Sequence, residues 1–85
     1  MRRSRLEICI DILKAVEDGK TKFTRVMYES NTSWQILQEN VQFLMKNGLI
    51  QTKQNGKRKA YTLTEEGHKI ISDFKKIERA IPLLA

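Results

Sequence analysis

The chain has 85 residues, of which 40% are hydrophobic and 31% are charged, a balance that predicts one small folded domain and excludes a disordered chain. No apolar run approaches the roughly 20 residues of a membrane-spanning helix, and a single cysteine cannot form an intrachain disulfide. The net charge of +6 favours a polyanionic partner, nucleic acid ahead of an anionic membrane, with an ordinary solvated basic surface as the simpler alternative.

The first predicted element is a helix from Arg3 to Asp18. Ser4 and Glu7 have the spacing of a capping box, and Gly19 is typical of the residue that follows a helix. The apolar residues recur every three or four positions in two stripes, which predicts a helix covered on more than one side. These stripes are Leu6, Cys9, Leu13 and Val16, and Ile8 and Ile12.

A short helix from Thr21 to Ser30, a turn at Asn31 and a longer helix are predicted next. Thr32 is expected to cap the longer helix, with Gln35 at the capping-box position, and Asn47-Gly48 is expected to end it. Both helices need an apolar face turned inward. Those faces are Phe23, Val26 and Met27 in the short helix, and Trp34, Leu37, Val41 and Leu44 in the longer one.

A β-hairpin follows, with strands predicted from Leu49 to Gln54 and from Lys57 to Leu63. Asn55-Gly56 between them is the strongest short hairpin signal, a two-residue type I′ turn that pairs Ile50 with Tyr61. The tip is crowded with cations, which repel one another unless phosphates or a minor groove relieve the repulsion. These cations are Lys53, Lys57, Arg58 and Lys59.

Thr64 is predicted to cap a last helix, in which Gly67 weakens the first turn and Pro82 bends or ends the helix. Apolar residues then repeat at four-three spacing, the pattern of a helix that packs against another helix. We expect this seam to form a two-fold homodimer, with Ile8 and Ile12 as further apolar surface; the alternative is a helix folded back on a monomeric core. The seam consists of Ile70, Phe74, Ile77, Ile81 and Leu84.

Together these elements predict a mainly α chain with a small β-hairpin: a winged helix-turn-helix over residues 1–64 and a C-terminal dimerisation helix over 65–85, forming a single domain. In such a fold the longer helix lies in the major groove of double-stranded DNA. Glutamine donates and accepts at an adenine edge, so Gln35 and Gln38 are candidate base readers. The full candidate DNA-binding set is Ser33, Gln35, Gln38, Gln42, Lys46, Lys53, Lys57, Arg58 and Lys59.

The residues that enzymes and metal sites require are sparse. His68 has no histidine or cysteine at ligand spacing, and Cys9 lies in an apolar run where inert packing is expected. The chain contains no glycine-rich phosphate loop. We therefore predict no catalytic residue, no metal and no cofactor.

The chain resembles the archaeal winged helix-turn-helix transcriptional regulators, the family that includes the small ten-kilodalton chromatin-associated DNA-binding proteins of crenarchaea. The resemblance lies in RSRLEICIDILKAVEDG, TKFTRVMYESNTSW, LQENVQFLMKNGLI and AYTLTEEG, which cover most of the chain. It implies antiparallel dimerisation through the last helix, a helix in the major groove, wing contacts to the flanking backbone, and a cytoplasmic, nucleoid-associated protein without membrane contact.

One departure and two alternatives accompany this resemblance. Chromatin-type members have a long coiled coil, whereas Pro82 here follows Thr64 by 18 residues, which argues against a rod-like architectural dimer. The alternatives to a sequence-preferring regulator are a non-specific chromatin-type DNA binder and a winged-helix module for protein–protein interaction.

Overall fold

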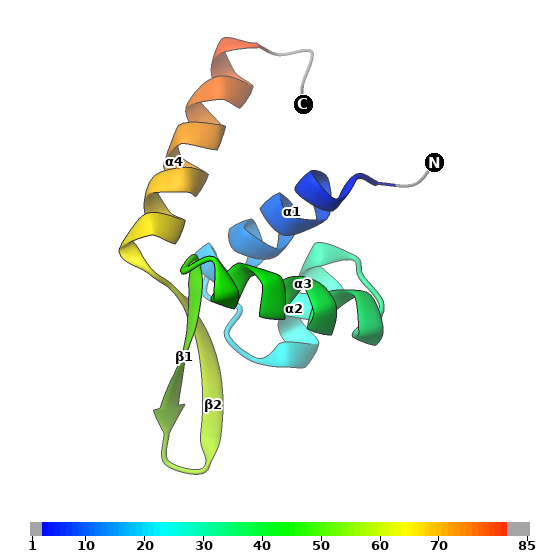
Figure 1. The fold of residues 1–85 in the computed structure, drawn as a ribbon, viewed down its shortest axis with the longest axis vertical. Coiled ribbons are helices and arrows are strands. Elements are labelled where there is room, and N and C mark those ends of the chain that lie inside the picture. Colours follow the sequence, from blue (N-terminus) through cyan, green and yellow to red (C-terminus); the bar gives the residue numbers. More distant parts are fainter. Residues whose placement is uncertain (1–2, 82–85) are drawn as a thin grey trace.

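The computed structural model describes residues 3–81, apart from the side chains of Asn55 and Arg58. Three helices form the body of the molecule, and the hairpin and the last helix extend from it in opposite directions (Figure 1). Among the described residues, no helix is both long and apolar enough to cross a membrane. The elements are α1 (Arg5–Glu17), α2 (Phe23–Ser30), α3 (Trp34–Lys46), β1 (Ile50–Asn55), β2 (Arg58–Leu63) and α4 (Glu65–Ala80).

The helix α1 is the centre of the hydrophobic core. Its predicted capping box is confirmed: the Glu7 amide donates to Ser4 Oγ at 3.1 Å, and the Ser4 amide donates to Glu7 Oε1 at 3.4 Å. Ile12 is fully buried, so the prediction that it adds outward apolar surface is wrong. The core consists of Cys9, Ile10, Ile12, Leu13, Ala15 and Val16 of α1, with Val26, Leu37, Val41, Leu44, Ile50, Leu63 and Ile71 from the other elements.

The start of α2 and the cap of α3 differ from prediction. The Thr21 carbonyl accepts a hydrogen bond from the Tyr61 amide of β2 at 2.9 Å, so α2 begins only at Phe23. The cap of α3 is Ser33, whose Oγ accepts from the Ile36 amide, because the left-handed Asn31 places the helix start one residue later than expected. Thr32 instead shares a hydrogen bond with the Ser30 hydroxyl.

The hairpin forms where it was predicted, but in a different register. Ile50 pairs with Leu63 rather than Tyr61, and Asn55 pairs with Arg58. The loop is therefore Gly56-Lys57, with Gly56 at φ +67°, the positive angle that a type II′ turn requires at its first position. The two registers differ by two residues, so both place the same side chains on the same face and the apolar pattern cannot choose between them.

The helix α4 is attached to the hairpin and to α3 at one backbone junction. The Leu49 carbonyl accepts from the Thr64 amide at 3.1 Å, and the Thr64 hydroxyl caps α4 by accepting from the Gly67 amide at 3.0 Å. A Cβ atom on Gly67 would lie 2.1 Å from the Leu49 carbonyl oxygen. Gly67, which the sequence suggested only weakens the helix, therefore permits the close approach of α4 to this junction.

The two sides of α4 have different surroundings. Ile71, which was not part of the predicted seam, is fully buried in the core. The ion pair of Lys14 with Glu78, at 2.9 Å, and that of Glu17 with Lys75 attach α4 to α1. The hydrogen bond to Glu17 raises the pKa of Lys75. The predicted seam residues Ile70, Ile77 and Ile81 remain 38%, 47% and 48% exposed.

The helix α4 ends at Ala80, and Ile81 has already left the helical conformation, as a residue before proline is expected to do. Phe74 is partly buried against the core. The predicted roles of Pro82 and Leu84 lie outside the described residues.

We predict that Gly67→Ala destabilises the fold. At an open helical position this change stabilises a protein by roughly 0.5–1 kcal/mol, but here the added methyl group meets the Leu49 backbone, and we expect a loss of about 1–3 kcal/mol. Urea unfolding measures the difference, and Ser72→Ala, at an exposed position of the same helix, is the control. A Gly67→Ala variant as stable as the unmodified chain would contradict the close packing of α4.

Candidate nucleic-acid interface

The outer face of α3 is polar and free of core contacts. Leu37, Val41 and Leu44 are buried on the inner face as predicted, so the residues on the opposite side of the helix point outward. Ser33, Gln35, Gln42 and Lys46 are exposed and Gln38 is half-buried. The structure therefore places the five predicted α3 residues where a partner can reach them.

The inner face of α3 also holds a polar residue that the apolar pattern did not reveal. Asn40 is buried, its Nδ2 donates to the Ile36 carbonyl at 2.8 Å, and its Oδ1 accepts from Cys9 Sγ at 3.6 Å. Burial raises the pKa of the Cys9 thiol, which keeps it protonated. Asn40 and Cys9 thus fix α3 against α1 and have no access to the outer face.

The hairpin presents cations on both of its faces. Lys53, Lys57 and Lys59 are exposed, and Arg58 begins β2. Lys53 pairs with Ala60, and Lys59 pairs with Gln54. Because successive residues of a strand point to opposite faces, the two neighbouring pairs lie on opposite sides of the hairpin, and so do Lys53 and Lys59.

A groove of about 580 Å³ lies between the outer edge of α3 and the hairpin. It brings together three predicted site residues from two elements: Gln38 and Gln42 of α3 and Lys59 of β2. Burial raises the pKa of Tyr61 in its wall, so its hydroxyl is neutral near pH 7. The lining is Phe23, Trp34, Gln38, Val41, Gln42, Met45, Thr52, Lys59 and Tyr61.

Other predicted residues lie outside this groove. The Gln35 side chain donates to Glu39 Oε1 at 3.3 Å on the exposed surface of α3. Ser33 and Lys46 lie at the two ends of α3, and Lys53 and Lys57 lie toward the hairpin tip. The candidate interface is therefore a surface centred on the groove, with further polar groups around it.

The exposure of Trp34 is the largest difference between the predicted site and the structure. Trp34 was predicted to be buried with Leu37 and Val41, but its side chain is 59% exposed. It lies in the groove with Phe23 of α2 and Tyr61 of β2. Its ring contacts the Phe23 ring instead, with the centroids 5.9 Å apart. The spacing that put Trp34 in the apolar stripe does not show how much of each residue in the stripe is covered by neighbouring segments.

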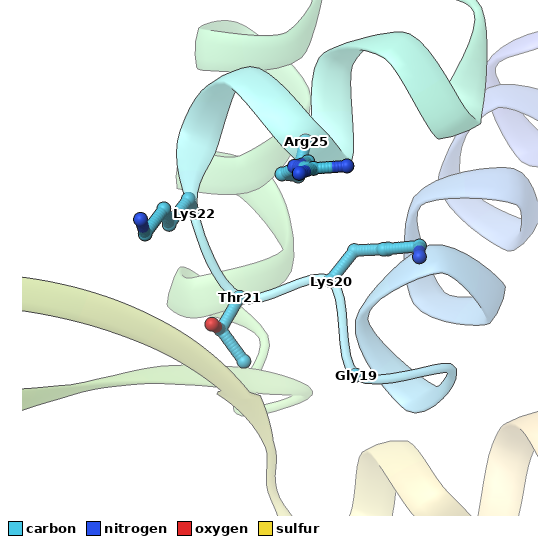
Figure 2. A pocket seen from close by; sticks show the side chains of 5 residues that line it. All are labelled: Gly19, Lys20, Thr21, Lys22 and Arg25. Atoms are coloured by element: carbon cyan, nitrogen blue, oxygen red, sulfur yellow. The ribbon is translucent and has the colours of Figure 1, made fainter.

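The loop between α1 and α2 adds cations that the sequence interpretation missed. Lys20, Thr21, Lys22 and Arg25 line a shallow hollow with Gly19, and Figure 2 shows Lys22 pointing to the other side of the loop from Lys20 and Arg25. The hydrogen bond between the Thr21 carbonyl and the Tyr61 amide holds this loop beside β2. The three cations fall within six residues, a local density that could have been noticed in the sequence.

No three histidine, cysteine, aspartate or glutamate side chains gather as metal ligands within residues 3–81. The residues named above supply amides, hydroxyls, cations, and aromatic and aliphatic side chains. Such groups bind by hydrogen bonding, charge and apolar contact.

Comparison with known proteins identifies the fold. A family model described as "Winged helix-turn-helix" matches residues 2–81. The uncharacterized protein MJ0287 of Methanocaldococcus jannaschii is 34% identical over 73 residues, which are 86% of this chain and 71% of that protein. The predicted fold class, three helices and a two-stranded hairpin with a C-terminal helix, is confirmed.

The solved structures that are similar to the chain include two DNA-binding proteins. Sso10a-2, a DNA-binding protein from Sulfolobus solfataricus, superposes with a TM-score of 0.77 at 28% identity, over 96% of this chain and 85% of Sso10a-2. BpsR of Bordetella bronchiseptica, a protein whose DNA binding is regulated by 6-hydroxynicotinic acid, also gives a TM-score of 0.77, over 89% of this chain and 57% of BpsR. At 14% identity the second likeness shows the fold alone.

Proposed function

This chain belongs to the winged helix-turn-helix family, and we propose that it is a DNA-binding transcriptional regulator. In this proposal α3 enters the major groove of duplex DNA, and the hairpin, the wing of the fold, lies on the flanking backbone. The proposal rests mainly on the groove between α3 and the wing. Gln38 and Gln42 of α3 and Lys59 of the wing all line this groove. The DNA-binding Sso10a-2, similar over nearly the whole chain, supports it.

The chemistry of each part suits a different feature of DNA. Gln38 and Gln35 carry amides that match the paired donor and acceptor of an adenine edge. The exposed cations of the wing attract phosphates on both of its faces. Lys22 and Arg25 at the start of α2 add cations near the wing, because the Thr21–Tyr61 hydrogen bond holds the preceding loop beside β2.

A regulator fits the composition of α3 better than a non-specific chromatin protein does. A non-specific binder gains its affinity from cations that contact phosphates. The predicted contact face of α3 instead carries three glutamines, Gln35, Gln38 and Gln42, and one cation, Lys46. Amides contribute little to phosphate attraction but discriminate between bases, so we propose sequence preference. The proposal includes no catalytic step.

We further propose that α4 forms a two-fold homodimer. The exposed Ile70 and Ile77 lie on one edge of the helix, beside Ile71, which seals the chain's own core, and the exposed Ile81 directly follows the helix. Leu6 of α1, 67% exposed, and Ile70 both line an adjoining apolar groove between α1, α3 and α4. An apolar surface of this kind on a small domain favours association. A two-fold partner would cover it and present two α3 helices to a pseudo-palindromic site.

The first prediction from the proposed function concerns the wing. Changing Lys57, Arg58 and Lys59 to Ala should weaken binding to all duplexes alike, because phosphate contacts carry no sequence information. The slope of log affinity against log salt should flatten by about 0.9 for each lost phosphate contact. Changing Lys69, Lys76 and Arg79 of α4 to Ala removes the same charge at a distance and should leave the slope nearly unchanged. Equal slopes for the wing triple variant and the unmodified chain would remove the wing from the interface.

The second prediction concerns assembly. The unmodified chain should sediment at micromolar concentration as a dimer of its 10.0 kDa protomer. Ile77→Glu with Ile81→Glu should give a folded monomer, because both positions are exposed and the charges oppose burial in an interface. The control is Ser72→Glu with Lys69→Gln, which makes the same change in net charge at exposed positions of α4. A monomeric unmodified chain would contradict the dimer.

A further inference from the structure

Trp34 is an exposed aromatic residue on the polar side of the molecule. It is the single tryptophan of the chain, and it belongs neither to the core nor to the apolar residues packed against the core. Its side chain lines the groove between α3 and the wing. Its side chain is 59% exposed, and it lies in one groove with Gln38, Gln42 and Lys59, so the ring is available for contact with a partner.

The Trp34 ring is held in position by neighbouring rings. It contacts Phe23 at a centroid distance of 5.9 Å and an interplanar angle of 52°, and Phe23 contacts Tyr61 of β2 at 6.3 Å. Edge-tilted contacts of this kind are favourable between aromatic side chains. The chain of rings therefore connects Trp34 to the wing and limits the freedom that the ring would lose on binding.

The polar neighbour of Trp34 in the groove is Gln38, one helical turn further along α3. Four residues of helix rise about 6 Å, close to two base-pair steps of about 3.4 Å each. A helix that places the Gln38 amide at one base edge thus places the Trp34 ring at the edge of a base pair one or two steps away.

We infer that Trp34 is a specificity-determining residue that selects thymine by packing against its C5-methyl group; this inference rests on the proposed DNA-binding function. The major groove presents donors, acceptors and, among the four bases, one apolar group, which is the thymine methyl. The Trp34 ring carries a single N–H donor, which finds an acceptor on guanine, adenine and thymine alike, whereas its apolar surface matches only the thymine methyl group. Stacking on an unpaired base would not distinguish thymine from uracil.

The test uses the duplex that the unmodified chain selects from a random pool, and the same duplex with each thymine replaced in turn by deoxyuracil. This replacement removes one methyl group and keeps the base pairing. At fixed salt, the unmodified chain should lose about fourfold in affinity at the contacted thymine, the effect of one buried methyl group. Trp34→Ala should bind both duplexes equally, and Trp34→Phe should keep part of the preference.

Tyr28→Ala is the matched control, because Tyr28 is an aromatic side chain of α2 that is 80% exposed and does not line the groove. It should discriminate between the two duplexes as the unmodified chain does. The fluorescence of Trp34 in the unmodified chain gives a readout that needs no variant: its change on binding should be smaller with the deoxyuracil duplex.

Three results would overturn the inference. An unmodified chain that binds the selected duplex but is indifferent to every thymine methyl overturns the inference alone. If the Trp34→Ala variant loses affinity by the same factor on both duplexes and still prefers the methylated one, Trp34 is a positioning contact. Failure of the unmodified chain to bind duplex DNA removes the proposed function and this inference with it.

Discussion

The contact on which the rest of the structure depends is the packing of the first turn of α4 against the Gly48–Leu49 backbone. The Leu49 amide donates to the Leu44 carbonyl at the end of α3, and the Leu49 carbonyl accepts from the Thr64 amide at the end of β2. Gly67 presses against the same carbonyl. One residue thus fixes the end of α3, the base of the hairpin and the start of α4, so the direction of the wing relative to α3 is set by the backbone.

This junction also separates two surfaces with different chemistry. The groove between α3 and the wing combines amides, hydroxyls and a cation with aromatic and aliphatic side chains, whereas the groove between α1, α3 and α4 is lined almost entirely by apolar side chains. The core around α1 lies between them, and the ion pairs of Lys14 with Glu78 and of Glu17 with Lys75 hold α4 in place. A partner at the α4 surface therefore leaves the α3 surface open, which a DNA-binding dimer requires.

Local signals predicted what depends on local interactions. The capping residues Ser4 and Thr64, the buried Leu37–Val41–Leu44 stripe and the hairpin itself were correct because neighbouring residues decide them. The predicted register of the hairpin was wrong. A loop at Asn55-Gly56 and a loop at Gly56-Lys57 place the same side chains on the same face, so the apolar pattern cannot choose between them. The exposure of Trp34 depends on how far Phe23 covers its ring, and the role of Gly67 depends on how closely α4 meets Leu49. Periodicity does not contain these distances between segments.

The central claim is that α3 reads sequence, and the most direct test is the ratio of affinities for the selected duplex and for random DNA at fixed salt. For Gln35→Ala and Gln38→Ala we expect a loss of about 1–3 kcal/mol on the selected duplex and much less on random DNA, because base-edge hydrogen bonds exist only on the preferred site. Gln51→Ala, an exposed glutamine of β1, is the control and should leave the ratio unchanged. Equal losses on both DNAs in the α3 variants would contradict base reading and favour a non-specific chromatin-type binder.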